Sequence, residues 1–212
     1  MSTRTCSFFA PLSWLVLFIF DCHTYIQNKG DLTMTTLNTD RLTLRHFKTS
    51  DAASVYHYAS NPNIGPIAGW PVHQSEAESR FYIENYFMSP HIFAITLKSN
   101  PDDVIGLVGL ELVDEGNAKD FMTAHQAEIS YWLGEPFWGQ GLVPEAIAAV
   151  IDYGFNTLHL TDIWCGYKDG NEQSKRAQEK QGFYYERTIH HMYNPVLDEE
   201  IIEHFTILHN SN

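Results

Sequence analysis

The sequence predicts an α+β fold in which helices cover both faces of a mixed sheet of about seven strands. Three observations predict it: apolar alternation typical of strands, segments with helical spacing between them, and turn residues such as Gly, Pro and Asn at the boundaries. The chain has 212 residues, of which 44% are apolar and 14% aromatic. This is enough material for one domain with a full core, without internal repeats or low-complexity tracts.

The expected elements follow one another in the order β-α-α-β-β-β-α-β-α-β-β. Strands are expected at residues 41–47, 91–97, 104–113, 127–134, 162–167, 183–192 and 200–208, and helices at residues 52–60, 74–87, 142–155 and 171–181. Thr49, Ser50 and Asp51 offer capping side chains before the first helix. Residues 61–71 hold two Gly and three Pro and are expected to form a loop.

Charge and cysteine content exclude several classes of function. The formal net charge is −13, from 13 Lys and Arg against 26 Asp and Glu, which argues against a nucleic-acid partner and suits a cationic substrate such as an amine. The three cysteines, at positions 6, 22 and 165, lack the number and spacing of a disulfide framework or a zinc site. His190 and His191 are adjacent, but strand neighbours point to opposite faces, so no metal site is predicted.

The first 33 residues differ from the rest of the chain. Residues 8–20 form an apolar run of thirteen, which is shorter than the roughly 20 residues of a membrane-spanning helix and suits the core of a signal peptide. Three interpretations stay open: translation that starts at Met34, a signal or membrane anchor, and a structural extension. We therefore divide the chain into an extension, 1–33, and a catalytic domain, 34–212, and expect a cytoplasmic protein without a membrane partner.

A glycine-rich turn between a strand and a helix is the strongest local motif. It lies in AEISYWLGEPFWGQGLVPEAIAAVI, residues 127–151. Gly139 and Gly141 allow the backbone to approach a ligand closely, and Pro144 suits the first turn of a helix. The free N–H groups of such a turn form an anion site suited to a pyrophosphate. No GxxxxGK[ST] or complete GxGxxG motif is present, so a P-loop and a dinucleotide fingerprint are excluded.

This motif resembles the acetyl-CoA-binding segment of the GNAT acetyltransferase superfamily. An aromatic residue and Trp before Gly-x-Gly, with Glu-Ala opening the helix, resemble the ribosomal-protein N-terminal acetyltransferase group. The segment DGNEQSKRAQEKQGF, residues 169–183, and the opening LNTDRLTLRHF, residues 37–47, are also similar to the family. The resemblance implies the GNAT fold, with a mostly antiparallel sheet and a cofactor cleft between two splayed strands.

The resemblance also implies where acetyl-CoA binds. The pantetheine arm would pair with the exposed backbone of Tyr131, Trp132 and Leu133. The pyrophosphate would lie on the turn that follows, formed by Trp138, Gly139, Gln140, Gly141, Leu142 and Val143. A small Gly or Ala is usual in the family at Val143, and a β-branched side chain there could crowd the phosphate.

Three residues are candidates for a role near the reacting atoms. Glu128 matches a catalytic Glu of some family members and is predicted to be the base; the alternative is an ion-pair partner. Ser174 matches a Ser near the cofactor sulfur, proposed as proton donor; the alternative is a surface Ser. Asn171 matches a cofactor contact and is also suited to cap a helix.

Other positions depart from the family. Gln178 stands where many relatives have a Tyr that acts as an acid, and Tyr193 stands near an expected second Glu. The loop 61–71 is expected to line the acceptor side, or else to place Trp70 against the core.

The sequence thus predicts an N-acetyltransferase that uses acetyl-CoA and acts on an amine, with a peptide or protein N-terminus as the first choice of acceptor. Alternatives are a small-molecule amine as acceptor, a catalytically silent module that binds acetyl-CoA and regulates a partner, and a membrane-anchored protein. A homodimer is also compatible with the sequence.

Overall fold

The computed structural model describes residues 35–115, 119–194 and 196–211, and the proposed extension of residues 1–33 lies outside these ranges. The strands are β1 (Leu37–Asn38), β2 (Leu42–Arg45), β3 (Ile92–Leu97), β4 (Asn100–Leu112), β5 (Gln126–Leu133), β6 (Asp162–Lys168), β7 (Tyr184–Asn194) and β8 (Glu199–His209). The α-helices are α2 (Ala52–Ala59), α3 (Gly65–Ala68), α4 (Glu76–Tyr82), α5 (Leu142–Asp152) and α6 (Glu172–Lys180). Short 3₁₀ turns are η1 (Thr49–Asp51), η3 (Val113–Glu115) and η4 (Glu135–Phe137), and the π-helical turns η2 (Ile83–Phe87) and η5 (Tyr153–Thr157) extend α4 and α5.

These strands form one sheet in the order β1-β2-β3-β4-β5-β6-β8-β7. Among the strands that the structure describes, β5 and β6 are the one parallel pair, and the other neighbours are antiparallel. The ladder between β5 and β6 contains only three pairs and ends at Glu128 and Trp164. Because β5 continues to Leu133 and β6 to Lys168, the two strands separate beyond these pairs.

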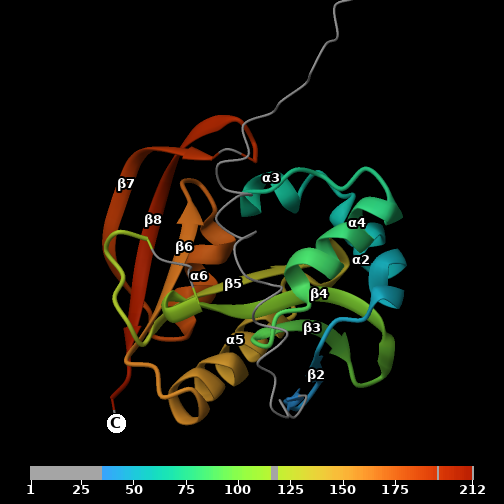
Figure 1. Cartoon of the computed structure of the whole chain (residues 1–212), viewed down its shortest axis with the longest axis horizontal. Helices are drawn as coiled ribbons and strands as arrows, with labels where there is room; N and C mark the ends of the chain where they lie inside the picture. Colours follow the sequence, from blue (N-terminus) through green and yellow to red (C-terminus); the bar gives the residue numbers. More distant parts are fainter. Residues whose placement is uncertain (1–34, 116–118, 195, 212) are drawn as a thin grey trace, which may run out of the picture. The chain divides into compact units, whose positions relative to one another are not determined.

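Helices lie on both sides of the sheet, with α5 below strands β3 to β5 in Figure 1 and α4 above them. Leu142, Ala146, Ile147 and Val150 follow helical spacing on α5 and are buried in the main core. A second, smaller core contains Met122, Trp164, Phe205 and Ile207. No helix in ranges 35–115, 119–194 and 196–211 is long and apolar enough to cross a membrane.

The predicted fold class and element order are confirmed, with three local corrections. The sheet gains β1, whose two residues are too short to give an alternating pattern. The predicted loop at 61–71 contains α3, which Pro66 helps to begin and which Gly69 ends in a left-handed conformation. The interval between the strands predicted at 91–97 and 104–113 is mostly strand, because β4 already begins at Asn100. Leu97 pairs with Asn100, and a bulge beside this pair absorbs the irregular register.

Candidate active site

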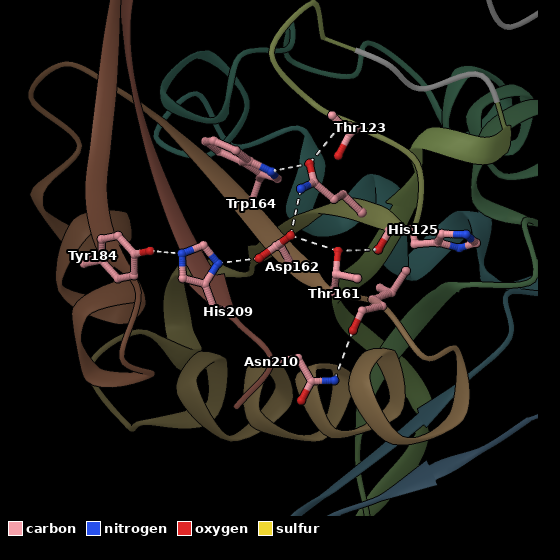
Figure 2. Close-up of polar contacts among 10 residues, drawn as sticks. Thr123, His125, Thr161, Asp162, Trp164, Tyr184, His209 and Asn210 are labelled. Carbon is pink, nitrogen blue, oxygen red and sulfur yellow. Dashed lines mark hydrogen bonds and ion pairs between the residues drawn. The ribbon is translucent and has the colours of Figure 1, made fainter. Parts of the chain in front are cut away.

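The separation of β5 from β6 begins beyond a group of hydrogen-bonded side chains that we call the clamp: Gln126, Asp162, Trp164 and His209. Gln126 Nε2 donates to Asp162 Oδ2 at 2.7 Å, and the Trp164 indole donates to Gln126 Oε1 at 2.9 Å. His209 bonds Asp162 with one ring nitrogen and Tyr184 with the other (Figure 2). Burial opposes ionisation of Asp162, but the hydrogen bonds that it accepts hold its pKa below the ordinary value. The clamp therefore ties β5, β6, β7 and β8 together at the closed end of the cleft.

The glycine-rich turn follows the open end of β5. Gly139 and Gly141 have φ angles of 72° and 75°, which favour glycine because a Cβ is strained in this region. Gly141 is the N-cap of α5. Because Pro144 has no N–H, the free amides of the first helical turn are those of Leu142 and Val143. No heavy atom would lie within 4 Å of a Cβ at Gly139, so open space adjoins a set of donors suited to a phosphate.

Two side chains of the turn point away from this open space. Trp138 donates its indole N–H to the carbonyl oxygen of Leu133 at 2.7 Å, which fixes the turn against the end of β5. Val143 is half-buried and packs against the main core.

Arg41, which precedes β2, contacts this turn, and sequence reasoning missed it. Its guanidinium bonds Glu145 of α5 at 2.7 Å and the carbonyl oxygen of Gln140 at 2.8 Å. A Cβ at Gly141 would lie 3.6 Å from Arg41 Nη2. The Arg41 side chain is 49% exposed, so its guanidinium, paired with Glu145, reaches the surface beside the free amides. The opening segment that contains Arg41 did carry the family resemblance, but this contact joins residues far apart in the sequence.

Four polar side chains from β5, α6 and β8 form what we call the neutral network: Tyr131, Ser174, Gln178 and Thr206. The Tyr131 hydroxyl lies 2.8 Å from Ser174 Oγ. Gln178 Nε2 lies 3.0 Å from Ser174 Oγ, and Thr206 donates to Gln178 Oε1 at 2.7 Å. Burial, more than any other cause, raises the pKa of the Tyr131 phenol, so the network is neutral at physiological pH.

Asn171 caps α6 next to this network. Its Oδ1 accepts from the Ser174 N–H at 3.1 Å, as expected for an N-cap residue. Its Nδ2 donates to the carbonyl oxygen of Ile67 in α3 at 3.3 Å. The cap therefore fixes the first turn of α6, which holds Ser174 beside β5.

On the opposite face of the sheet lies a group that we call the charged cluster: Glu111, Lys119, Glu128 and Glu203. Lys119 Nζ lies 2.8 Å from Glu128 Oε1 and 2.6 Å from Oε2. Glu111 is the cross-strand partner of Glu128. Glu128 and Tyr131 are three residues apart on β5, and alternation of side chains places them on opposite faces.

Gly166 allows two carboxylates to converge where β6 has left β5. A Cβ at Gly166 would lie only 2.5 Å from Glu203 Oε1 and 3.2 Å from Glu128 Oε1. The second carboxylate oxygen of Glu203 is buried without a hydrogen-bond partner among the residues that the structure describes. The absence of a side chain at Gly166 thus makes room for both acids.

Burial and mutual repulsion perturb the acids of this cluster. Burial, together with repulsion from Glu128, raises the pKa of Glu111 to about 7. Burial also raises the pKa of Glu203 to about 7, although Lys119 opposes the shift. Burial would lower the pKa of Lys119, but Glu128 and Glu203 outweigh it and raise that pKa. The cluster therefore holds a lysine ammonium beside two acids, Glu111 and Glu203, that bind protons near neutral pH.

The remaining predicted positions have local structural roles. Trp70 is half-buried and packs 6.0 Å, centroid to centroid, from Trp132, as the alternative of a Trp against the core predicts. Tyr193 is exposed and donates to Asp198 Oδ1 at 2.5 Å. The hairpin of β7 and β8 reaches the α3 loop, where Asn194 Nδ2 donates to the carbonyl oxygen of Gly69 at 2.9 Å.

The structure thus divides the predicted catalytic residues between two groups. Ser174 joins Tyr131, while Glu128 lies on the other face with Lys119. Sequence reasoning missed Lys119, which lies between the strands predicted at 104–113 and 127–134. It also missed Glu203, which meets Glu128 only through the pairing of β6 with β8. Within ranges 35–115, 119–194 and 196–211 no three His, Cys, Asp or Glu residues are arranged to hold a metal ion.

Comparisons with known proteins agree with this geometry. The family model described as "Acetyltransferase (GNAT) domain" matches residues 41–184. The "Uncharacterized N-acetyltransferase p20" of Bacillus licheniformis is 31% identical over 158 residues, which cover 72% of this chain and 84% of that protein.

Solved structures share the fold. A ribosomal-protein-S5-alanine acetyltransferase from Vibrio fischeri superposes with a TM-score of 0.65 at 20% identity, over 84% of this chain and 98% of that one. The microcin C7 self-immunity acetyltransferase MccE, in complex with acetyl-CoA and AMP, superposes with a TM-score of 0.67 at 20% identity, over 85% of this chain and 100% of that one.

Proposed function

The chain belongs to the GNAT acetyltransferase family and is an N-acetyltransferase; we propose that its donor is acetyl-CoA and its acceptor the N-terminal amine of a peptide or protein. The observation that carries the proposal is the separation of β5 from β6 after Glu128, with the glycine-rich turn of α5 at its open end. An extended arm fits an unpaired strand edge, and a pyrophosphate fits a helix N-terminus.

The residues around this opening fit acetyl-CoA. Residues 129–133 of β5 have no ladder with β6, so Tyr131 to Leu133 offer backbone groups to the pantetheine arm. The amides of Leu142 and Val143, the turn from Trp138 to Gly141, and the guanidinium of Arg41 would hold the phosphates. Acetyl-CoA supplies a thioester whose carbonyl carbon bonds to the amine nitrogen while the carbon–sulfur bond breaks.

The charged cluster is suited to the acceptor amine. An ammonium near pKa 8 to 10 must lose a proton before its nitrogen can attack. We assign Glu128 as the group that takes this proton. Glu111 and Glu203, whose pKa values are raised to about 7, lie beside Glu128 to accept the proton next and restore the carboxylate. The three acids also attract a cationic acceptor, and the net charge of −13 acts in the same direction.

Two observations support an N-terminal amine as acceptor. One solved structure of the same fold is a ribosomal-protein-S5-alanine acetyltransferase. In addition, the α3 loop and the β7–β8 hairpin meet near the first turn of α6 and expose Ile67, Tyr193 and Val196, which would contact the first side chains of a peptide.

The proposal is tested with the full chain in two steps. Saturation with acetyl-CoA at 100 times its dissociation constant should raise the free energy of unfolding by about 2.7 kcal/mol. Release of the CoA thiol is then measured with peptides that differ only in a free or a blocked N-terminus, and with small primary amines. Turnover of the free peptides alone is the expected result. Turnover of small amines alone would refute the acceptor class, and a missing stabilisation by acetyl-CoA would refute the donor.

A further inference from the structure

Gln178 is a buried polar side chain at the centre of the neutral network. It is 0% exposed and lies on α6, one helical turn after Ser174. The family resemblance implies that many relatives have at this position a Tyr that acts as an acid, which this chain lacks. A primary amide neither gives nor takes a proton at neutral pH, so its role must lie in the hydrogen bonds that it makes.

The surroundings of Gln178 allow only one orientation of its amide. Its nitrogen lies 3.3 Å from the carbonyl oxygen of Gly166, which can only accept a hydrogen bond. Its oxygen accepts from the Thr206 hydroxyl at 2.7 Å. A flipped amide would place two acceptors against each other at Gly166 and leave a buried oxygen unsatisfied. The amide nitrogen is therefore held toward α6.

This orientation decides what Ser174 can do. Gln178 Nε2 donates to Ser174 Oγ at 3.0 Å and so fills one of the two acceptor sites of the hydroxyl. The Tyr131 hydroxyl lies 2.8 Å from the same oxygen and can fill the second site as a donor. Two other acceptors adjoin the Tyr131 hydroxyl: the Ser174 carbonyl oxygen, which is more distant at 3.3 Å, and the Cys165 sulfur, which is only a weak acceptor. When Tyr131 donates, the Ser174 hydroxyl proton has no acceptor within the network.

We propose that Gln178 is a positioning residue: together with Tyr131 it fills the acceptor sites of Ser174 Oγ, so that the Ser174 hydroxyl donates to the sulfur of CoA. This inference rests on the proposed function. As the carbon–sulfur bond breaks, negative charge collects on the sulfur, and a hydrogen bond donated by a fixed hydroxyl stabilises it. Gln178 thus aims a donor without becoming an acid itself.

The inference is tested on the thiol of bound CoA, which needs no acceptor. The ultraviolet absorbance of the thiolate is titrated with CoA bound to the parent, Ser174→Ala, Gln178→Met and the double variant. A hydrogen bond to the thiolate lowers the pKa of the thiol. We expect Ser174→Ala and Gln178→Met each to raise it by about one unit, a tenfold change, with no further rise in the double variant. With any amine that turns over, kcat should fall by the same factor at unchanged affinity for acetyl-CoA.

Two further variants separate positioning from general damage. Gln178→Glu keeps the shape and the bond from Thr206, but a carboxylate draws the Ser174 proton to itself, so the same rise is expected even where Gln178→Met folds poorly. Thr96→Val removes another buried hydroxyl, which donates to Thr43 outside the site, and should leave the bound thiol unchanged.

A titration of bound CoA that is unchanged in the Gln178 variants, or effects of Ser174 and Gln178 that add in the double variant, would overturn the positioning role. CoA that fails to bind the parent would instead overturn the proposed function, and this inference with it.

Discussion

The two polar groups at the separation of β5 and β6 use opposite physical means on opposite faces of the sheet. The neutral network is built from hydroxyls and one amide, and the Gly166 carbonyl group sets the orientation of that amide. The charged cluster gathers three carboxylates around one ammonium, and burial raises the pKa values of two of them, Glu111 and Glu203, to about 7. The first arrangement is suited to hold a donor in place, and the second to exchange protons.

This difference matches the two demands of amide formation from a thioester. The leaving sulfur needs a donor that is in place before charge develops there, whereas the amine must lose a proton to a group that can be recharged by solvent. Strand alternation separates the two, because Glu128 and Tyr131 lie three residues apart on β5. Buried acids placed beside the thiol would repel the thiolate and raise its pKa, so the separation has a chemical benefit.

The largest expected effect comes from a substitution that disrupts only the charged cluster. Glu128→Gln should lower kcat by roughly 10²–10⁴-fold, the range for loss of a general base. Affinity for acetyl-CoA should stay within about twofold of the parent, because α5 and its turn lie on the other face. Turnover as a function of pH and acetyl-CoA binding by calorimetry are the two measurements. A pH–rate profile that keeps its shape and height in this variant would remove Glu128 from the mechanism.

A second prediction concerns the contribution of the charged cluster to the free energy of unfolding. The pKa of Glu203 is raised from an ordinary 4.5 to about 7 in the folded protein, so the folded state binds protons more tightly than the unfolded chain. The stability due to this group is therefore complete below pH 4.5 and is lost as the pH rises through 7. Lys119, Glu128 and His204 act on the charge of Glu203, and Glu111 lies beside Glu128 on the neighbouring strand. The parent should lose about 2 kcal/mol from this source between pH 5 and 7.5, and Glu203→Gln should lose less.

Denaturant unfolding at a series of pH values measures the slope of the unfolding free energy against pH. Glu186→Gln is the matched control, since Glu186 is exposed on β7, and its slope should equal that of the parent. A parallel slope in Glu203→Gln would show that Glu203 does not bind its proton more tightly on folding.

Features that depend on local chain geometry could be predicted from the sequence. The glycine-rich turn, the start of α5 and the cap of Asn171 on α6 are set by residues within a few positions of one another. Their patterns indicate a turn, a helix and a cap in any context. The order of strands and helices was predictable for the same reason, apart from the two residues of β1 and the single turn of α3.

The features that could not be predicted depend on which strands become neighbours. Glu203 meets Glu128 only because β8 pairs with β6 and because Gly166 leaves space between them. Arg41 likewise bonds Glu145 across a long sequence separation, whereas Lys119 lies only nine residues before Glu128, in a connection whose path no sequence pattern predicts. Gln178 appears in the sequence only as a missing Tyr, and its use becomes visible once Thr206 and the Gly166 carbonyl lie on either side of its amide.

The smallest expected effect concerns the glycine-rich turn. This turn would bind the acetyl-CoA on which the neutral network and the charged cluster both act. Gly141 has a φ of 75°, so Gly141→Ala should cost about 1–2 kcal/mol in the folded protein or pull the turn out of shape. Gly170→Ala is a matched control, because Gly170 has a φ of 83° and room for a Cβ, but lies outside the turn. Both variants should lose similar stability, while only Gly141→Ala should weaken acetyl-CoA binding, by about tenfold, if the turn holds the phosphates. Equal affinities in the two variants would mean that the phosphates do not lie on this turn, and the donor would then have to be held by the β5 edge and Arg41 alone.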